Sequence, residues 1–301
     1  MRKMSEELLK LKAVTLLHDP PNKPWLIREN KEYREESKSL VVELLGEEAA
    51  ELLNREEVRR ASSVAMGIDG YILPSVLRER YTPKLFGVEG IVLKNTINPF
   101  FKVRLDDSFK GYADRYKKFK ERLKHVLEGI GDWRLKYCAL YALYEPTWIR
   151  MELPIGPADL RAPVFTMFDH AYASATATNW IHGVKEGAKG LLVGLDVAGP
   201  QTFISHSRKL RDVWASSYTV SALVWYAVLE LLDQLGPDIV LKPTLRLNPF
   251  YLHWLKHRLS TQLEEVEAII YPAEDLRSMY KELGIPPYAV IPVSYTHLRA
   301  H

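Results

Sequence analysis

"LLHDPPNKPW", residues 16–25, decides how the first half of the chain is interpreted. An apolar helical stretch reaches His18 and Asp19 here, and two prolines follow at once. Because Pro20 disfavours helical backbone in the residue before it, the helix is predicted to end at this pair. The carbonyls and the negative dipole pole at a helix C-terminus favour a bound cation. The pair is therefore either an ordinary polar helix end or half of a metal site.

The composition is that of a soluble globular protein, with 301 residues of which 47% are apolar and 26% charged. This length suits one large domain or two ordinary ones. A net charge of +3 permits a polyanionic partner without indicating one. The lone cysteine, Cys138, excludes an internal disulfide and fits a reducing compartment. The charged N-terminus is unlike a signal peptide, and no apolar run reaches membrane-spanning length, so we expect a cytoplasmic protein without a membrane partner.

Hydrophobic periodicity predicts that the first half is mainly helical. Ser5 is the predicted N-cap of the first helix. Further helices are predicted over 39–53, 56–78, 112–144 and about 164–182, with an irregular segment at 81–111 and a loop at 154–163. Asp69 falls on the inward-facing stripe of the helix 56–78. A buried carboxylate needs a cation, a hydrogen-bond donor or a proton, so Asp69 is a candidate ligand.

The character of the sequence changes near residue 189. "LLVGLDV" (191–197) is a continuous apolar run, which is expected of a buried strand, and "DIVLKP" (238–243) is a second candidate strand. A long helical region between the two is predicted to end at Gly236. This strand–helix–strand order predicts a separate α/β domain.

A basic group stands at the start of that helical region. Arg208, Lys209 and Arg211 lie close together, with Trp214 just beyond them. Basic residues beside an aromatic side chain are found at nucleic-acid interfaces, and equally on solvated faces or subunit contacts. The composition favours the solvated face.

A second acidic and imidazole pair, Asp169-His170, lies in "FTMFDHAYASA". Together with His18, Asp19 and Asp69 it offers ligands suited to a first-row divalent metal such as manganese, iron, cobalt, nickel or zinc. Such an ion lowers the pKa of bound water and neutralises charge on a phosphate. Ordinary satisfied helix ends explain adjacent His and Asp residues equally well, so the ligand types alone leave both interpretations open. The chain has no Walker-type loop, no G-x-G-x-x-G and no nucleophile elbow.

Four blocks of sequence resemble one protein family. They are "LLHDPPNKPW", "PADLRAPVFTMFDHAYASA", "GPQTFISHSRKLRDVWASSYTVSALVW" and "LGPDIVLKPTLRLNP", and they occur in the order expected of the large subunit of type III-B CRISPR Cmr complexes. The resemblance covers most of residues 10 to 255. It implies a mainly α HD-type metal-dependent nuclease domain over 1–188, followed by the start of an α+β ferredoxin-like (Palm) domain over 189–291.

The resemblance also implies partners and cofactors. The family's HD domain cuts single-stranded DNA with a divalent transition metal (manganese, nickel, cobalt or iron), and its paired Palm domains bind ATP and make cyclic oligoadenylates. Other Cmr subunits hold a CRISPR RNA, and target RNA switches the activities on. No Gly-Gly-Asp-Asp is present in this chain, so cyclic oligoadenylate synthesis is not expected from it. Residues 292–301 do not continue the family pattern and are expected to be a foreign tail on an N-terminal fragment.

Carried over residue by residue, His18 and Asp19 match the HD motif, Asp69 matches a later aspartate, and Asp169 and His170 match the Asp-His pair. His18, Asp19, Asp69 and His170 are the expected catalytic residues, and Asp169 is a fifth ligand or a residue that orients His170. Two positions depart from the pattern. Gly70 stands where an arginine usually follows Asp69, and Phe165 stands where a polar residue is common.

These departures keep three hypotheses open. The chain is a metal-dependent nuclease module, a catalytically degenerate scaffold that docks other Cmr subunits and CRISPR RNA, or an HD phosphohydrolase that acts on a small nucleotide. Bound metal distinguishes the scaffold from the nuclease, because a scaffold needs no ion.

Overall fold

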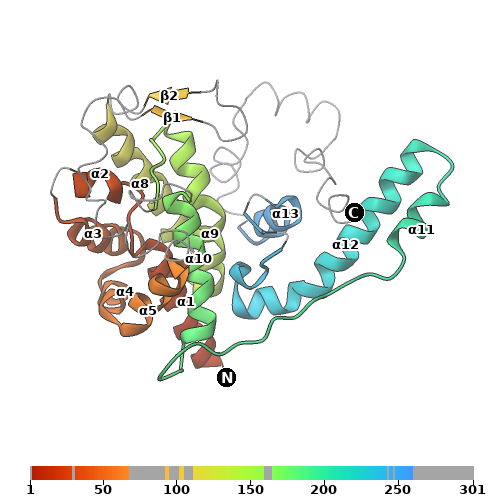
Figure 1. The fold of residues 1–301 in the computed structure, drawn as a ribbon, viewed down its shortest axis with the longest axis horizontal. Helices are drawn as coiled ribbons and strands as arrows, with labels where there is room; N and C mark the ends of the chain where they lie inside the picture. Colours follow the sequence, from red (N-terminus) through yellow and green to blue (C-terminus); the bar gives the residue numbers. More distant parts are fainter. Residues whose placement is uncertain are drawn as a thin grey trace, which may run out of the picture. The chain divides into compact units, whose positions relative to one another are not determined.

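The structure, a computed structural model, describes residues 2–28, 31–67, 92–94, 102–104, 111–158, 165–242, 244–246 and 248–259. The chain divides into two compact units, Met1–Lys189 and Gly190–His301. The described residues are mainly helical (Figure 1).

Unit 1 is a bundle of helices around a central first helix (Figure 1). Its elements are α1 (Arg2–Leu17), α2 (Lys23–Arg28), α3 (Tyr33–Leu45), α4 (Glu47–Ala50), the 3₁₀ turn η1 (Glu51–Asn54), α5 (Glu56–Ala65), β1 (Val92–Lys94), β2 (Lys102–Arg104), α8 (Tyr112–Glu128), α9 (Trp133–Arg150) and α10 (Met167–Ile181). Helix α1 packs against α5, α9 and α10, and α10 also packs closely against α5.

The C-terminal half of α1 occupies the interior because it is mostly apolar. Every residue from Leu11 to Leu17 is buried, including the polar Lys12 and Thr15. A helix that is covered on all sides belongs to the core rather than to the surface of a domain. Its C-terminal end, with His18 and Asp19, is therefore delivered into the protein interior.

An aromatic cluster fixes α8, α9 and α10 to one another. Phe119 meets Trp148 edge-on at 5.1 Å between ring centroids, and Tyr144 meets Phe168 edge-on at 5.2 Å. Edge-to-face pairs of this kind contribute about 0.5–1.5 kcal/mol beyond the burial of their area. Because Phe168 precedes His170 by two residues, the cluster also anchors the start of α10.

The helices of unit 1 differ from the predicted ones mainly at their ends. The predicted cap at Ser5 is wrong, because α1 begins at Arg2. The predicted helix 39–53 is broken at Gly46, whose φ of 95° ends α3. The predicted helix 112–144 is two helices, since residues 129–132 separate α8 from α9. Of the predicted helix 56–78, α5 accounts for residues 56–65, and residues 68–78 lie outside the described part.

The segment predicted to be irregular contains a small antiparallel ribbon. Strands β1 and β2 pair with Leu93 opposite Val103. A second short contact, an isolated bridge between Pro157 and Thr166, leads into α10.

The regular elements described in unit 2 are all helices or 3₁₀ turns. They are α11 (Pro200–Ser205), α12 (Leu210–Leu235), the 3₁₀ turn η4 (Pro237–Ile239) and α13 (Pro249–Arg258). The predicted end at Gly236 is confirmed, because this glycine caps α12 with a φ of 96°.

The two predicted strands of unit 2 are wrong. Residues 191–197 make no strand, and 191–196 are exposed, while residues 237–239 form the turn η4. A strand needs a hydrogen-bonded neighbour, and none is present in the described part of this unit.

Helix α12 is long and apolar enough to span a membrane by length and composition, contrary to the expectation that no run qualifies. Within the described part of the protein, 22% of the most apolar 18-residue stretch of this helix is buried. The same test is passed by core helices of soluble proteins, so this feature alone does not indicate a membrane.

Candidate metal centre

His18 and Asp19 follow the last residue of α1, as the sequence predicts. The hydroxyl of Ser37 donates to the carbonyls of Leu17 and His18, at 3.2 and 2.6 Å. A side chain of α3 therefore satisfies two of the carbonyls at this helix end, which are less available to a cation than the sequence suggests.

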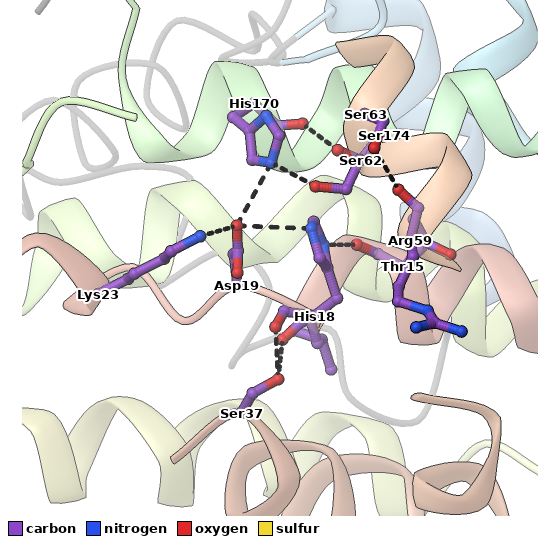
Figure 2. Close-up of polar contacts among 11 residues, drawn as sticks. Thr15, His18, Asp19, Lys23, Ser37, Arg59, Ser62, Ser63, His170 and Ser174 are labelled. Atoms are coloured by element: carbon purple, nitrogen blue, oxygen red, sulfur yellow. Dashed lines mark hydrogen bonds and ion pairs between the residues drawn. The ribbon is translucent and has the colours of Figure 1, made fainter. Parts of the chain in front are cut away.

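The imidazole of His18 is held in one orientation by its own helix. Its Nδ1 lies 2.6 Å from the Thr15 carbonyl, which accepts the N–H (Figure 2). In the neutral ring, this bond leaves Nε2 as an unprotonated lone pair. Nε2 is buried and has no hydrogen-bond partner among the described residues. Burial, followed by the nearby charges of His170 and Lys23, lowers the pKa of His18, although Asp19 opposes this shift. A neutral imidazole with a fixed tautomer is the form that binds metals.

His170 is brought to the same place by α10. A capping box opens this helix, because Thr166 Oγ1 accepts from the Asp169 N–H while Asp169 Oδ2 accepts from the Thr166 N–H. His170 follows at the next position and is 5% exposed. Its Nε2 lies 3.3 Å from Asp19 Oδ2 and 3.3 Å from the hydroxyl of Ser62 on α5.

Asp19 is the centre of the arrangement (Figure 2). Its Oδ2 lies 2.6 Å from Lys23 Nζ, 3.3 Å from His170 Nε2 and 3.5 Å from His18 Nε2. Burial on its own raises the pKa of Asp19, but the charges of His18 and Lys23 and the hydrogen bond from His170 outweigh it, so the pKa is well below its usual value. The carboxylate is therefore ionised and buried, a state that requires positive partners.

The geometry of these three residues fits a divalent metal ion. One ligand atom from each of His18, Asp19 and His170 lies within 4.8 Å of the others. Ligand atoms about 2.0–2.1 Å from a tetrahedral ion stand roughly 3.3–3.4 Å apart. The separations of 3.3 and 3.5 Å from Asp19 Oδ2 to the two imidazoles are close to that spacing. The unpartnered lone pair of His18 adds a donor with no other use among the described residues.

Of the remaining residues that the sequence singled out for this site, the structure describes Asp169 and Phe165. Asp69 and Gly70 lie outside the described residues. Asp169 belongs to the capping box and is not one of the three clustered residues. Phe165 is exposed.

The basic group belongs to unit 2. Arg208, Lys209 and Arg211 are all exposed there, and Lys209 is the N-cap residue of α12.

Three residues at the centre were not among the predicted ligands. Lys23 lies within the quoted stretch, but its approach to Asp19 depends on the turn that the two prolines make. Ser62 lies on the inward-facing side of α5, but a serine at such a position is only weak evidence of a site residue. The hydroxyl of Tyr144 is fully buried without a hydrogen-bond partner among the described residues, and burial and the charge of Asp19 raise its pKa.

Comparisons with known proteins point to one family. The family model described as "CRISPR-associated protein Cmr2, N-terminal" matches residues 192–296. The Cmr2 subunit of Saccharolobus solfataricus is 34% identical over 95% of this chain and 29% of its own length. The Cmr2 subunit of Pyrococcus furiosus is 34% identical over 32% of this chain and 10% of its own length. The chain thus spans less than a third of the curated relatives it matches.

A solved structure agrees with these relatives. A chain of the type III-B Cmr-beta complex, determined by cryo-EM in the apo state, superposes with a TM-score of 0.68. It is 31% identical, and the match covers 92% of this chain and 28% of that one. The resemblance noted in the four sequence blocks is therefore confirmed, and the chain belongs to the Cmr2 family of type III-B CRISPR large subunits, of which it spans a part.

Proposed function

We propose that this chain carries the hydrolytic centre of a type III-B large subunit, a metal-dependent site that cleaves phosphodiesters of single-stranded DNA in antiviral defence. The observation that carries the proposal is the convergence of His18, Asp19 and His170 from two separate helices. Two imidazoles and one carboxylate suit manganese, nickel, cobalt or iron.

Each residue has a definite role in this proposal. His18, Asp19 and His170 hold the ion, and Asp69 is a further candidate ligand. The Thr15 carbonyl keeps the lone pair of His18 Nε2 directed away from its own helix. When bound, a divalent ion lowers the pKa of a water molecule and neutralises charge on the phosphate.

Lys23 and Asp169 support the ligands. Lys23 keeps Asp19 ionised at its 2.6 Å contact. Asp169 fixes the first turn of α10 and thereby the position of the His170 ring.

The rest of the proposal concerns the larger assembly. On the family resemblance we also propose a first Palm-like ferredoxin domain over 189–291 that contributes to ATP binding, in the region where the family model matches residues 192–296. The relatives are subunits of Cmr complexes, which supports other Cmr subunits as partners. CRISPR RNA, target RNA and single-stranded DNA are proposed as partners on the family resemblance. Arg208, Lys209 and Arg211 are proposed contacts to nucleic acid or nucleotide. A chain with one cysteine fits a cytoplasmic setting.

The test is cleavage of a labelled single-stranded DNA by the purified chain with added Mn²⁺. We expect cleavage that needs Mn²⁺ and is abolished in His170→Gln. His206→Gln, which changes an exposed histidine of unit 2, is the matched control and should cleave like the wild type. Uncut DNA together with no bound metal would contradict the proposal.

One observation favours the alternative, a catalytically degenerate scaffold that docks other Cmr subunits and CRISPR RNA. Lys23 already pairs with the Asp19 carboxylate, beside which the two imidazoles lie, so its charge is balanced without an ion. Metal stoichiometry measured by mass spectrometry of the acid-digested protein distinguishes the two functions. The scaffold predicts no bound transition metal after dialysis against Mn²⁺, and the nuclease predicts at least one ion per chain.

A further inference from the structure

Ser62 lies at the edge of the candidate metal centre. It sits on α5, next to the buried Ala61, and its side chain faces α10 (Figure 2). The hydroxyl oxygen is 3.3 Å from His170 Nε2, the nitrogen that also faces Asp19. A third helix thus contributes a polar atom to a centre built by α1 and α10.

The distances between successive polar atoms are nearly equal from His18 through Asp19 and His170 to Ser62. From His18 Nε2 to Asp19 Oδ2 is 3.5 Å, from there to His170 Nε2 is 3.3 Å, and from that nitrogen to Ser62 Oγ is again 3.3 Å. These are close to the separations of neighbouring ligand atoms around one ion, roughly 3.3–3.4 Å for a tetrahedral site. Three ligands leave even a four-coordinate ion with room for a further donor, and they leave a six-coordinate ion such as Mn²⁺ with room for water as well.

We propose that the Ser62 hydroxyl is the fourth donor for a divalent cation at this centre. The inference rests on the proposed metal site, but it does not require that the loaded site cleave DNA.

Because the Ser62 hydroxyl is neutral, it leaves the charge of the ion available to an anionic substrate. The two imidazoles and the hydroxyl are neutral, so Asp19 is the one anion among the four donors. A divalent ion would therefore retain one net positive charge within this set, which attracts an anionic phosphodiester. A neutral oxygen donor also suits the harder Mn²⁺ better than a further soft ligand would.

The experiment measures Mn²⁺ affinity of the full chain by isothermal titration calorimetry. Ser62→Ala removes the oxygen and is expected to weaken Mn²⁺ binding about tenfold or more, the usual scale for groups that support a metal site. Ser62→Asp replaces it with a carboxylate and is expected to bind Mn²⁺ more tightly. Ser63→Ala is the matched control, because the Ser63 hydroxyl is exposed and donates to the Arg59 carbonyl.

The outcomes separate this inference from the nuclease proposal. Wild-type affinity in Ser62→Ala, with binding lost in His170→Gln, would overturn the role of Ser62 and leave the centre standing. No Mn²⁺ binding by the wild-type chain would overturn it as well. Weakened binding in Ser62→Ala alone, with DNA left uncut by the loaded wild type, would support Ser62 and reject the nuclease. Thermal melting without metal checks that the variants remain folded.

Discussion

Protonation of His18 is coupled to folding. Burial and nearby positive charge lower its pKa below the usual 6.5, so the folded chain binds fewer protons at this ring than the unfolded chain does. The free energy of unfolding should therefore fall as the pH drops below about 6.5. We expect the urea midpoint to decrease between pH 7 and pH 5, and to decrease less in His18→Gln. Equal decreases in both chains would show that the ring is not held in the neutral form.

Asp19 produces a second loss of stability at lower pH. Although burial opposes ionisation, the charges of His18 and Lys23 and the bond from His170 lower its pKa below the usual 3.8. Its contribution is therefore present above pH 3.8 and is lost as the pH falls from there towards the folded pKa. A urea series from pH 4.5 to pH 2.5 should show a steeper loss in the wild type than in Asp19→Asn.

Lys23 and a metal ion should stabilise the same carboxylate. Lys23→Met removes a 2.6 Å charged hydrogen bond from a buried group, so the metal-free chain should lose roughly 1–3 kcal/mol in unfolding free energy. Added Mn²⁺ should restore more stability to this variant than it adds to the wild type, as measured by urea unfolding with and without the ion.

Lys10→Met is the matched control for that change. Lys10 contacts Glu6 and Glu48 on the exposed side of α1, where an ion pair contributes less than about 1 kcal/mol. Equal losses in the two variants, with no added effect of Mn²⁺, would argue that Lys23 acts only as an ordinary surface charge.

The sequence predicts single residues well where a backbone signal accompanies the side chain. Pro20 ends α1 at the correct place, which brings His18 and Asp19 to the centre. Asp169 is predicted as a ligand or as a residue that orients His170, and the Thr-x-x-Asp pattern with Thr166 additionally makes it a capping residue. Ser62 gives only a weak signal in the sequence, because the contact that identifies it comes from a helix more than 100 residues away.

Among the elements, α5 is tied to the end of α10 by one side chain. Arg60 donates to the carbonyls of Val184 at 2.7 Å and Lys185 at 3.2 Å, and also to that of Gly187. Arg60→Leu would leave these carbonyls to water, with an expected loss of roughly 1 kcal/mol because the contacts are partly exposed. Hydrogen exchange should become faster over 183–189. The neighbouring exposed residue provides the control, since Arg59→Leu should leave exchange in this segment unchanged.

Hydrophobic periodicity in the sequence locates helices, because each helix buries one of its faces. It does not locate the points at which a helix is interrupted. The break at Gly46 depends on a φ of 95°, which no apolar pattern encodes. The strand predicted over 191–197 failed for a different reason. An apolar run forms a strand when another strand supplies hydrogen bonds, and the described part of unit 2 has none to offer.

At the scale of the whole molecule, the two units differ in how well they cover their apolar residues. The cores around α1 and the aromatic cluster belong to unit 1, whereas Leu191, Leu192 and Val193 of unit 2 are 90%, 85% and 81% exposed. Contiguous exposed apolar surface promotes association.

This difference predicts that unit 1 is self-sufficient. His18, Asp19, Ser62 and His170, together with the helices that position them, all lie within residues 1–189. A chain ending at Lys189 should therefore unfold cooperatively and bind Mn²⁺ with the affinity of the full chain, and it should aggregate less because the exposed segment 191–195 is gone. Calorimetry and light scattering measure these properties, with His170→Gln in the shortened chain as the control that loses the ion. A shortened chain that is unfolded, or folded but unable to bind Mn²⁺ when the full chain binds it, would show that unit 2 is needed to complete the centre.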